Sequence, residues 1–215
     1  MRCASLSNGH SGFCEWRQTP NRMAVIETHP VIVKGPWVDG VVLDKHTLHS
    51  VHIGDDPQWH PRFDTTRSAL GELVYRFKNR GGAPDDIVET AVAFIRSRWP
   101  NDIDCVVSPP PSVSRYRQPA QILAERIARV LGVPAPAAVV IKKVRTVPMK
   151  DLGKDQRESA LAAAIQPRYR DPVAGRQILL VDDLWETGST MRTVAQVLTS
   201  MGAAEIRVLG MTYTK

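Results

Sequence analysis

The stretch ILLVDDLWETGST, Ile178 to Thr190, decides the fold. Its first four residues are apolar in succession, which is typical of a strand buried on both faces of a parallel sheet. Two adjacent carboxylates, Asp182 and Asp183, follow at the point where the chain leaves that strand. A small, hydroxyl-rich turn then leads into residues 190–201, which have the apolar spacing of a helix. The stretch therefore predicts a strand, a polar loop and a helix in direct succession.

Strands and helices alternate on both sides of this unit. Buried strands are expected at 103–108, 137–142, 177–182 and 205–214, and helices at 67–80, 84–99, 118–131, 156–165 and 190–201. Right-handed crossovers through helices make such strands parallel. The predicted fold class is therefore α/β, with a doubly wound, mostly parallel sheet. In such sheets the site lies beyond the carboxyl ends of the strands.

The N-terminal part of the chain is predicted to be organised differently. Residues 1–22 are polar and rich in Ser, Gly and Asn without periodicity, so we expect a disordered extension. Residues 23–66 contain short β-prone runs separated by Gly and Asp turns, which predict a small N-terminal β-rich elaboration. Within it, 24–53 reads as an antiparallel hairpin or meander. The α/β core is then 67–215.

Composition and charge restrict the class of partner. No run among the 215 residues is apolar enough for a membrane span, and the N-terminus lacks the apolar stretch of a secretion signal, so a cytoplasmic location is expected. Cys3, Cys14 and Cys105 are odd in number and have no tight spacing, which argues against a disulfide framework or a zinc ribbon. The net charge of +6 and the pI of about 9.5 favour anionic partners, either nucleic acid or small phosphorylated molecules.

The loop after the strand combines two kinds of chemistry. Adjacent carboxylates attract Mg²⁺ or accept hydrogen bonds from vicinal hydroxyls, whereas a helix N-terminus with Thr187, Gly188, Ser189 and Thr190 is a cradle for phosphate. The alternative is that the acids merely end a strand while Thr187 or Ser189 caps the helix. Two uncompensated carboxylates repel each other, and a cation or polar ligand relieves that repulsion. We therefore favour a ligand site.

This loop resembles the phosphoribosyl pyrophosphate motif of type I phosphoribosyltransferases, and the element order of residues 70–213 is similar to theirs. Among them the chain looks most like the ComF-like, amidophosphoribosyltransferase-related branch, without its zinc ribbon. The resemblance implies that Asp182 and Asp183 hold the ribose hydroxyls and the metal. It implies that Thr187 to Thr190 bind the 5-phosphate, next to Glu186 at a variable place of the motif.

Two further loops have counterparts in that family. The loop SPPPSVSRYRQ, residues 108–118, stands where the family binds pyrophosphate, so the resemblance implies that Ser108 and Arg117 bind the ligand and that Arg115 acts in catalysis. Residues 142–161 stand where the family has its mobile catalytic loop, and Lys150 is our candidate there, beside Lys154 and Arg157. The alternative for each of these residues is a solvent-facing charge on a surface loop.

Histidines and aromatic residues of the N-terminal part are weaker candidates. His46, His49, His52 and His60 invite a metal interpretation, but strand spacing alternates their faces, so we expect surface or hydrogen-bonded histidines and assign no zinc. Trp37, Trp59 and Phe63 lie in the segment that would supply the hood, the subdomain that covers the base in the family. Packing is at least as good an account of them as base stacking.

The sequence therefore predicts a Mg²⁺-dependent phosphoribosyltransferase of nucleotide metabolism, with phosphoribosyl pyrophosphate as ligand and an unidentified base or amine as acceptor. A homodimer is common in the family. The alternative is a ComF-like protein that keeps the fold but binds single-stranded nucleic acid or has a regulatory role. The basic charge balance leaves that alternative open.

Overall fold

The protein was analysed as a computed structural model that describes residues 24–111, 118–143 and 163–214. Its centre is a five-stranded sheet in the order β1 (Val31–Ile32), β2 (Asp39–Lys45), β9 (Glu205–Tyr213), β8 (Gln177–Trp185) and β5 (Cys105–Val107). All neighbouring strands are parallel except β1, which pairs antiparallel with β2 at the edge. The predicted α/β class with a mostly parallel sheet is confirmed.

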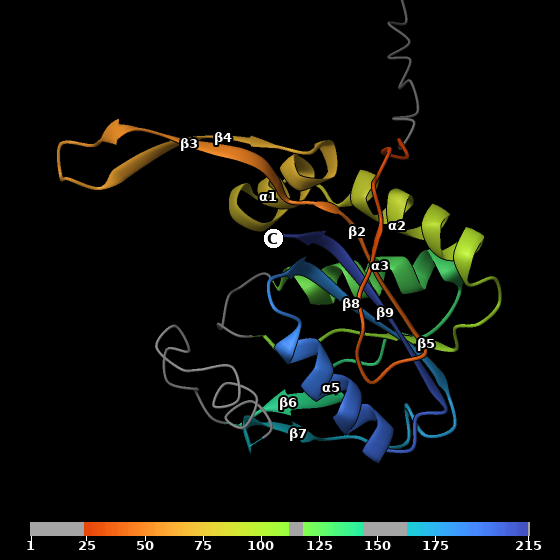
Figure 1. The fold of residues 1–215 in the computed structure, drawn as a ribbon. Helices are drawn as coiled ribbons and strands as arrows, with labels where there is room; N and C mark the ends of the chain where they lie inside the picture. Colours follow the sequence, from red (N-terminus) through yellow and green to blue (C-terminus); the bar gives the residue numbers. More distant parts are fainter. Residues whose placement is uncertain (1–23, 112–117, 144–162, 215) are drawn as a thin grey trace, which may run out of the picture.

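Alternate side chains of the central strands build a core on each face of the sheet. In β8, Leu179 and Val181 face one core, and Ile178 and Leu180 face the other, and all four are fully buried. This two-sided burial explains why the strand is an unbroken apolar run instead of an alternating one. The helices lie in two layers around it, as Figure 1 shows.

The helices α1 (Ala69–Arg80), α2 (Asp85–Arg98) and α3 (Pro119–Leu131) cover the first face (Figure 1). The ends of α1 agree with local chemistry, because the Ser68 side chain accepts a hydrogen bond from the Gly71 amide at 2.9 Å and Gly81 closes the helix in the left-handed conformation. The predicted helices 67–80, 84–99 and 118–131 are confirmed to within two residues at each end.

The second face is covered by α5 (Ser189–Ser200) and by a small antiparallel pair, β6 (Val140–Lys142) and β7 (Ile165–Pro167). The prediction that residues 137–142 form a strand of the main sheet is wrong, because β6 pairs with β7 and not with β5 or β8. The predicted helix 156–165 falls mostly outside the described residues, and its last residue, Ile165, begins β7.

The N-terminal elaboration differs from the prediction in one respect. Strand β2 belongs to the main sheet, where Asp39 to Lys45 run parallel to Arg207 to Tyr213. Its buried run from Gly40 to Asp44 contributes Val41 and Leu43 to one core and Val42 to the other. The antiparallel meander expected over 24–53 is therefore wrong for this strand. The division of the chain at residue 66 stays a prediction.

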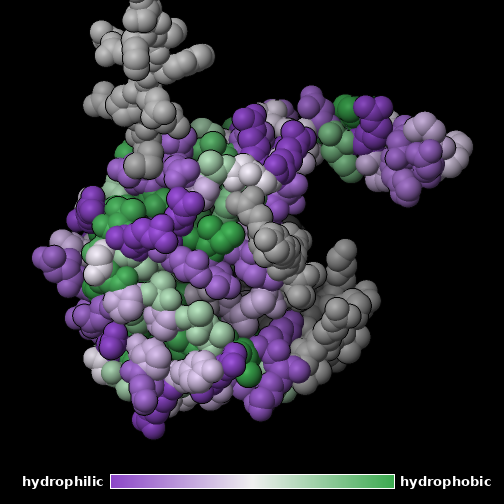
Figure 2. Space-filling view, turned by 180° about the vertical axis from the view of Figure 1, so that it is seen from behind, coloured by the Kyte–Doolittle hydropathy of each residue, from purple (hydrophilic) through white to green (hydrophobic). Residues whose placement is uncertain are grey.

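An antiparallel hairpin is present a little further along the chain. Strands β3 (Thr47–Asp55) and β4 (Pro61–Arg67) pair with each other and with no other strand of the described residues. We call residues 47–67 the arm, because they project from the body in both views (Figures 1 and 2). Both faces of the arm are exposed, and the large apolar side chains on it are Leu48, Val51, Ile53, Trp59 and Phe63.

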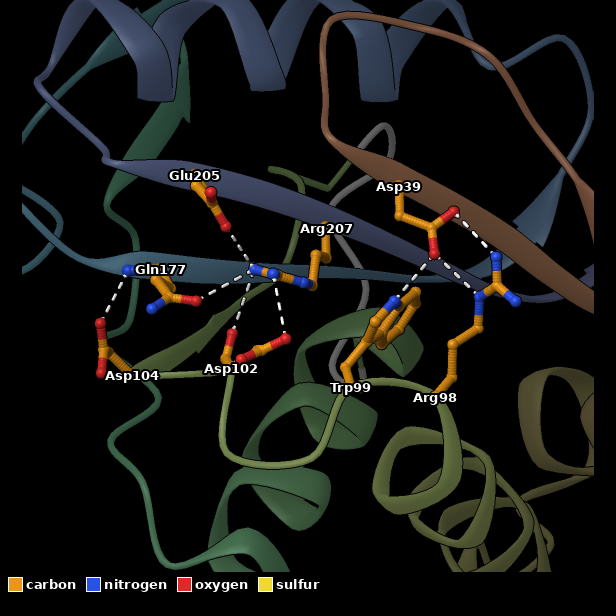
Figure 3. Close-up of polar contacts among 8 residues, drawn as sticks. All are labelled: Asp39, Arg98, Trp99, Asp102, Asp104, Gln177, Glu205 and Arg207. Atoms are coloured by element: carbon orange, nitrogen blue, oxygen red, sulfur yellow. Dashed lines mark hydrogen bonds and ion pairs between the residues drawn. The ribbon is translucent and has the colours of Figure 1, made fainter.

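A polar network joins the amino ends of the strands on the side opposite the loop after β8. Arg207 donates to Gln177 Oε1 at 3.1 Å and to the Asp102 carboxylate at 3.2 Å (Figure 3). Beside it, Asp39 accepts hydrogen bonds from the Arg98 guanidinium at 2.8 Å and the Trp99 indole at 2.9 Å. These contacts tie β2, β8 and β9 to the loop between α2 and β5.

Two further findings concern the buried cysteine and the apolar character of the helices. Cys105 is a free thiol, and burial raises its pKa to about 11, so the thiol stays protonated at neutral pH. Among the helices within the described ranges, none has the length and apolar character needed to cross a bilayer.

Candidate functional site

The two acids lie at the carboxyl end of β8, which continues through Trp185 instead of ending at Asp182. Asp182 Oδ1 accepts a hydrogen bond from the Asp183 amide at 3.0 Å. The side chains of adjacent strand residues point to opposite faces, so Asp182 is partly exposed while Asp183 is 7% exposed. We call Asp182 and Asp183 the acid pair.

Asp183 has a cationic partner that the sequence did not indicate. The Lys78 ammonium, on the last turn of α1, lies 2.9 Å from Asp183 Oδ2. The side chain of Lys78 is 25% exposed and that of Asp183 is 10% exposed, so the ion pair is shielded from water. The basic run around Lys78 is visible in the sequence, but only tertiary packing shows which of its members turns toward the acids.

The charges of the acid pair are unequal. Burial, and next the negative charge of Asp183, raise the pKa of Asp182 to about 8, while the Lys78 ammonium opposes this rise. The raised pKa favours the protonated form of Asp182, whereas Asp183 is paired with the Lys78 ammonium. A bound cation would favour the charged form of Asp182.

The turn from Thr187 to Thr190 has the form of a phosphate cradle. Gly188 is in the left-handed conformation with φ 73°, and α5 starts directly after it without a side-chain cap. Thr187 Oγ1 donates to Ser189 Oγ at 3.2 Å, so the two hydroxyls lie together at the helix start. The Ser189 amide donates to Thr187 Oγ1 at 3.4 Å, and the amides that follow in the first turn of α5 have no intrahelical acceptor. Free amides and hydroxyls at a helix N-terminus suit a phosphate dianion.

Two tryptophans support this turn from below. A Cβ at position 188 would overlap the Trp185 indole, so only glycine allows so close an approach. Trp37 packs edge-to-face against Trp185, with ring centroids 6.0 Å apart. The Trp37 indole N–H also donates to the Val33 carbonyl at 2.9 Å. Trp37 and Trp185 therefore act in packing, which was one of the two accounts expected for Trp37.

A cavity of about 540 Å³ joins these parts. Its wall brings together Ser108, the acid pair and the whole turn Glu186 to Thr190, all of which the sequence proposed as site residues. Lys78 and Lys142 are the cations among the described lining residues, and burial lowers the pKa of Lys142. The predicted residues Arg115, Arg117 and Lys150 lie outside the described residues, and so do Lys154 and Arg157.

The histidines and the arm aromatics lie elsewhere. Each histidine has a local partner: His46 contacts Thr212, His49 contacts Thr66, His52 contacts Asp55 and His60 contacts Asp56. Trp59 is 85% exposed and Phe63 is 56% exposed, and neither lines the cavity. In the described parts of the chain no group of three or more His, Cys, Asp or Glu side chains is arranged to hold a metal.

Comparison with known proteins identifies the family of this site. The family model of the phosphoribosyl transferase domain matches residues 118–210, a range that includes the acid pair and the turn after it. Residues 118–210 are thus similar in sequence to a phosphoribosyl transferase domain. The resemblance seen in the loop after β8 is confirmed for this part of the chain.

A curated relative of the domain is Competence protein F of Haemophilus influenzae, a distant homologue. It is 30% identical over 97 residues, which are 45% of this chain and 42% of the relative. The match therefore spans less than half of the relative's length.

Two solved structures illustrate the similarity of the fold. One is the glutamine phosphoribosylpyrophosphate amidotransferase from B. subtilis, at 20% identity and a TM-score of 0.44, covering 68% of this chain and 33% of that one. The other is adenine phosphoribosyltransferase from Saccharomyces cerevisiae, at 13% identity and a TM-score of 0.43, covering 76% and 85%.

Proposed function

We propose that the protein binds phosphoribosyl pyrophosphate together with Mg²⁺ and transfers ribose 5-phosphate to a base or amine. The observation that supports this most is the shared cavity. The acid pair suits a ribose diol, and the turn Thr187 to Thr190 suits a phosphate, and both line one cavity. A sugar that carries its phosphate on C5 would engage both at once.

In the proposed reaction the acceptor nitrogen forms a bond to C1 of the ribose. The bond from C1 to the pyrophosphate oxygen breaks, and pyrophosphate leaves with the electron pair. The transition state resembles an oxocarbenium ion, so the ring gains positive charge near the carboxylates of the acid pair. No covalent intermediate with the protein is required. Asp182 and Asp183 orient the sugar, and the hydroxyls and amides of the turn hold its phosphate.

The acid pair suits magnesium in a specific way. Mg²⁺ prefers oxygen ligands and usually binds through one or two carboxylates plus phosphate oxygens of the substrate. The described site offers two adjacent carboxylates, and Lys78 already contacts one of them. When bound, the ion would neutralise charge on the leaving pyrophosphate. Asp182 and Asp183 are the residues that would hold it. Arg115, Arg117 and Lys150 remain proposed as further contacts to the pyrophosphate.

The test is calorimetric titration of phosphoribosyl pyrophosphate with and without MgCl₂. We expect Mg²⁺-dependent binding that falls by at least about 10-fold in Asp182→Asn and in Asp183→Asn, because each loses charged acceptors for the sugar hydroxyls. Asp64→Asn is the matched control, since Asp64 is an exposed residue of the arm. The absence of Mg²⁺-dependent binding to the unaltered protein would overturn the proposal. Product formation from a panel of free bases and amines would then identify the acceptor.

A second candidate is a regulatory or single-stranded nucleic acid binding role within the same fold. The net charge of +6 and the similarity to Competence protein F favour it. The test is to measure the affinity of the protein for a single-stranded oligonucleotide at several salt concentrations. Contacts to phosphates would make that affinity fall steeply as salt rises. Affinity that is absent at low salt would rule it out.

A further inference from the structure

Among the described residues of the N-terminal half, Lys78 is the one that lines the cavity. Its ammonium lies 2.9 Å from Asp183 Oδ2. Apart from the Lys78 ammonium, no polar group among the described residues is a hydrogen-bond partner of that buried oxygen. The lysine is therefore the group in the described structure that compensates the charge on this side of the acid pair.

The placement of Lys78 follows from how α1 is anchored. The Ser68 hydroxyl, at the helix start, donates to the Lys45 carbonyl at 2.6 Å. Gly71 lies so close to the His46 carbonyl that a Cβ there would overlap it. The first turn of α1 is thus fixed against the end of β2. A rigid helix then carries Lys78, two and a half turns later, to the carboxyl end of β8.

A second contact reaches Asp183 from the same region. His46 Nδ1 lies 2.9 Å from Thr212 Oγ1, and Thr212 Oγ1 donates to the Asp183 carbonyl at 3.4 Å. The junction of β2 and the arm is therefore linked to the Asp183 backbone through Thr212 of β9, while α1 contacts the Asp183 side chain directly.

The other basic residues of α1 do not share this role. Arg76 pairs with Glu72 at 2.7 Å, and its side chain is 60% exposed. Arg80 lies over the Tyr75 ring, 5.4 Å from the centroid. These contacts lie among residues of α1 itself. Lys78 differs because it spans from α1 to a buried carboxylate of β8.

We propose that Lys78 is a counter-ion that compensates the charge of the acid pair when no metal is bound. As a consequence, Mg²⁺ enters only together with a phosphorylated ligand. Asp183 is buried, and burial makes an uncompensated carboxylate charge costly. The ammonium relieves that cost without any bound ion. Free Mg²⁺ gives up its water reluctantly and would also have to displace the lysine, whereas a diphosphate supplies further oxygens.

The test is thermal unfolding with and without 10 mM MgCl₂, at ionic strength matched with NaCl and with no nucleotide or sugar phosphate. We expect MgCl₂ alone to leave the Tm of the unaltered protein unchanged. Lys78→Met should lower the Tm by about 5 °C, because it leaves a buried carboxylate without its cation. MgCl₂ alone should restore most of that loss, because the ion then occupies the place of the ammonium.

Matched variants make the outcome decisive. Arg76→Met removes a cation from the same helix but from an exposed pair, and should change neither the Tm nor the response to Mg²⁺. Lys78→Met with Asp183→Asn removes both charges and should recover most of the lost Tm. The proposal is overturned if the double variant is as unstable as Lys78→Met, if Lys78→Met has the Tm of the unaltered protein, or if MgCl₂ alone stabilises the unaltered protein.

The two proposals fail separately. Charge compensation by Lys78 concerns the empty site and is read from unfolding alone. Entry of the metal with a ligand rests on the proposed function. A protein that shows the expected Tm pattern but does not bind phosphoribosyl pyrophosphate would overturn the proposed function and leave the counter-ion role intact.

Discussion

Single residues decide the shape of the phosphate turn. Gly188 combines a φ of 73° with close contact to the Trp185 indole, so both its missing Cβ and its backbone freedom are used. The sequence indicated this glycine through its place between two hydroxyl residues. It did not indicate the tryptophan beneath it, because Trp185 reads as an apolar residue of a loop until the strand is seen to continue.

We expect Gly188→Ala to weaken binding of phosphoribosyl pyrophosphate by at least about 10-fold, because strain and overlap with Trp185 displace the turn. Calorimetry measures the loss. Gly175→Ala is the matched control, because Gly175 has a φ of 70° but nothing within 4 Å of a new Cβ. The control should lower stability by about 1 kcal/mol and leave affinity unchanged. Equal affinity in both variants would contradict the role of the turn.

At the scale of elements, the arm stands apart from the cavity. Its strands pair only with each other among the described residues, and a two-stranded hairpin gains little stability by itself. Of the two accounts given for the aromatics of this region, base stacking is not supported for Trp59 or Phe63, since both lie on the arm, away from the lining of the cavity.

Replacing residues 51–64 with Asn-Gly should leave the Tm within about 2 °C of its starting value, because exposed side chains contribute little to stability. Ser50 and Thr65 lie directly opposite each other, so a two-residue turn closes the shortened hairpin there. Differential scanning fluorimetry measures the change. A much larger drop would show that the arm packs on the body or on another chain.

The polar network at the amino ends of the strands joins several elements through one side chain. Arg207 is 11% exposed and contacts Asp102, Glu205 and Gln177, which come from three segments (Figure 3). Its guanidinium offers several donors in a fixed geometry, which an ammonium would not reproduce. These contacts lie away from the cavity, so they concern stability and not ligand binding.

Arg207→Met should lower the free energy of unfolding by about 2 kcal/mol, because Gln177 and Asp102 lose charged hydrogen bonds. Denaturation with urea measures the change. Arg126→Met, which removes an exposed pair with Asp85, should cost less than about 1 kcal/mol. Ligand affinity should be the same in both variants. An equal cost for the two would show that burial of Arg207 adds nothing.

At the scale of the whole molecule, the site makes stability depend on pH. The pKa of Asp182 is about 8 in the folded protein, against 3.8 for an unperturbed aspartate. A raised pKa means that the folded state binds the proton more tightly than the unfolded state. The stabilisation is therefore complete below about pH 4 and is lost as the pH rises through about 8.

Without ligand, the protein should become less stable between pH 6 and pH 9, and Asp182→Asn should be less sensitive to pH over that interval because its amide does not titrate. Urea denaturation at several pH values in EDTA measures both slopes. Other groups titrate in both proteins, so the difference between the slopes is the informative quantity. Identical slopes would show that Asp182 is ionised throughout.

The sequence by itself determined the positions of α1, α2, α3 and α5 and of strands β5, β8 and β9, the two-sided burial of β8 and the content of the loop after it. These features depend on near neighbours: apolar runs, helical spacing, caps and turn residues act over a few positions. Asp182, Asp183 and the turn Thr187 to Thr190 were therefore identified as candidates before any fold was known, and the structure brings them to one cavity.

Only the tertiary structure decided which distant segments meet. It placed β2 beside β9, turned β6 toward β7, seated Trp185 under Gly188 and brought Lys78 of α1 to Asp183. The physical reason is that strand pairing and buried ion pairs join residues far apart in the chain. Their free energy depends on packing and desolvation in the finished core, and no local pattern of residues records it.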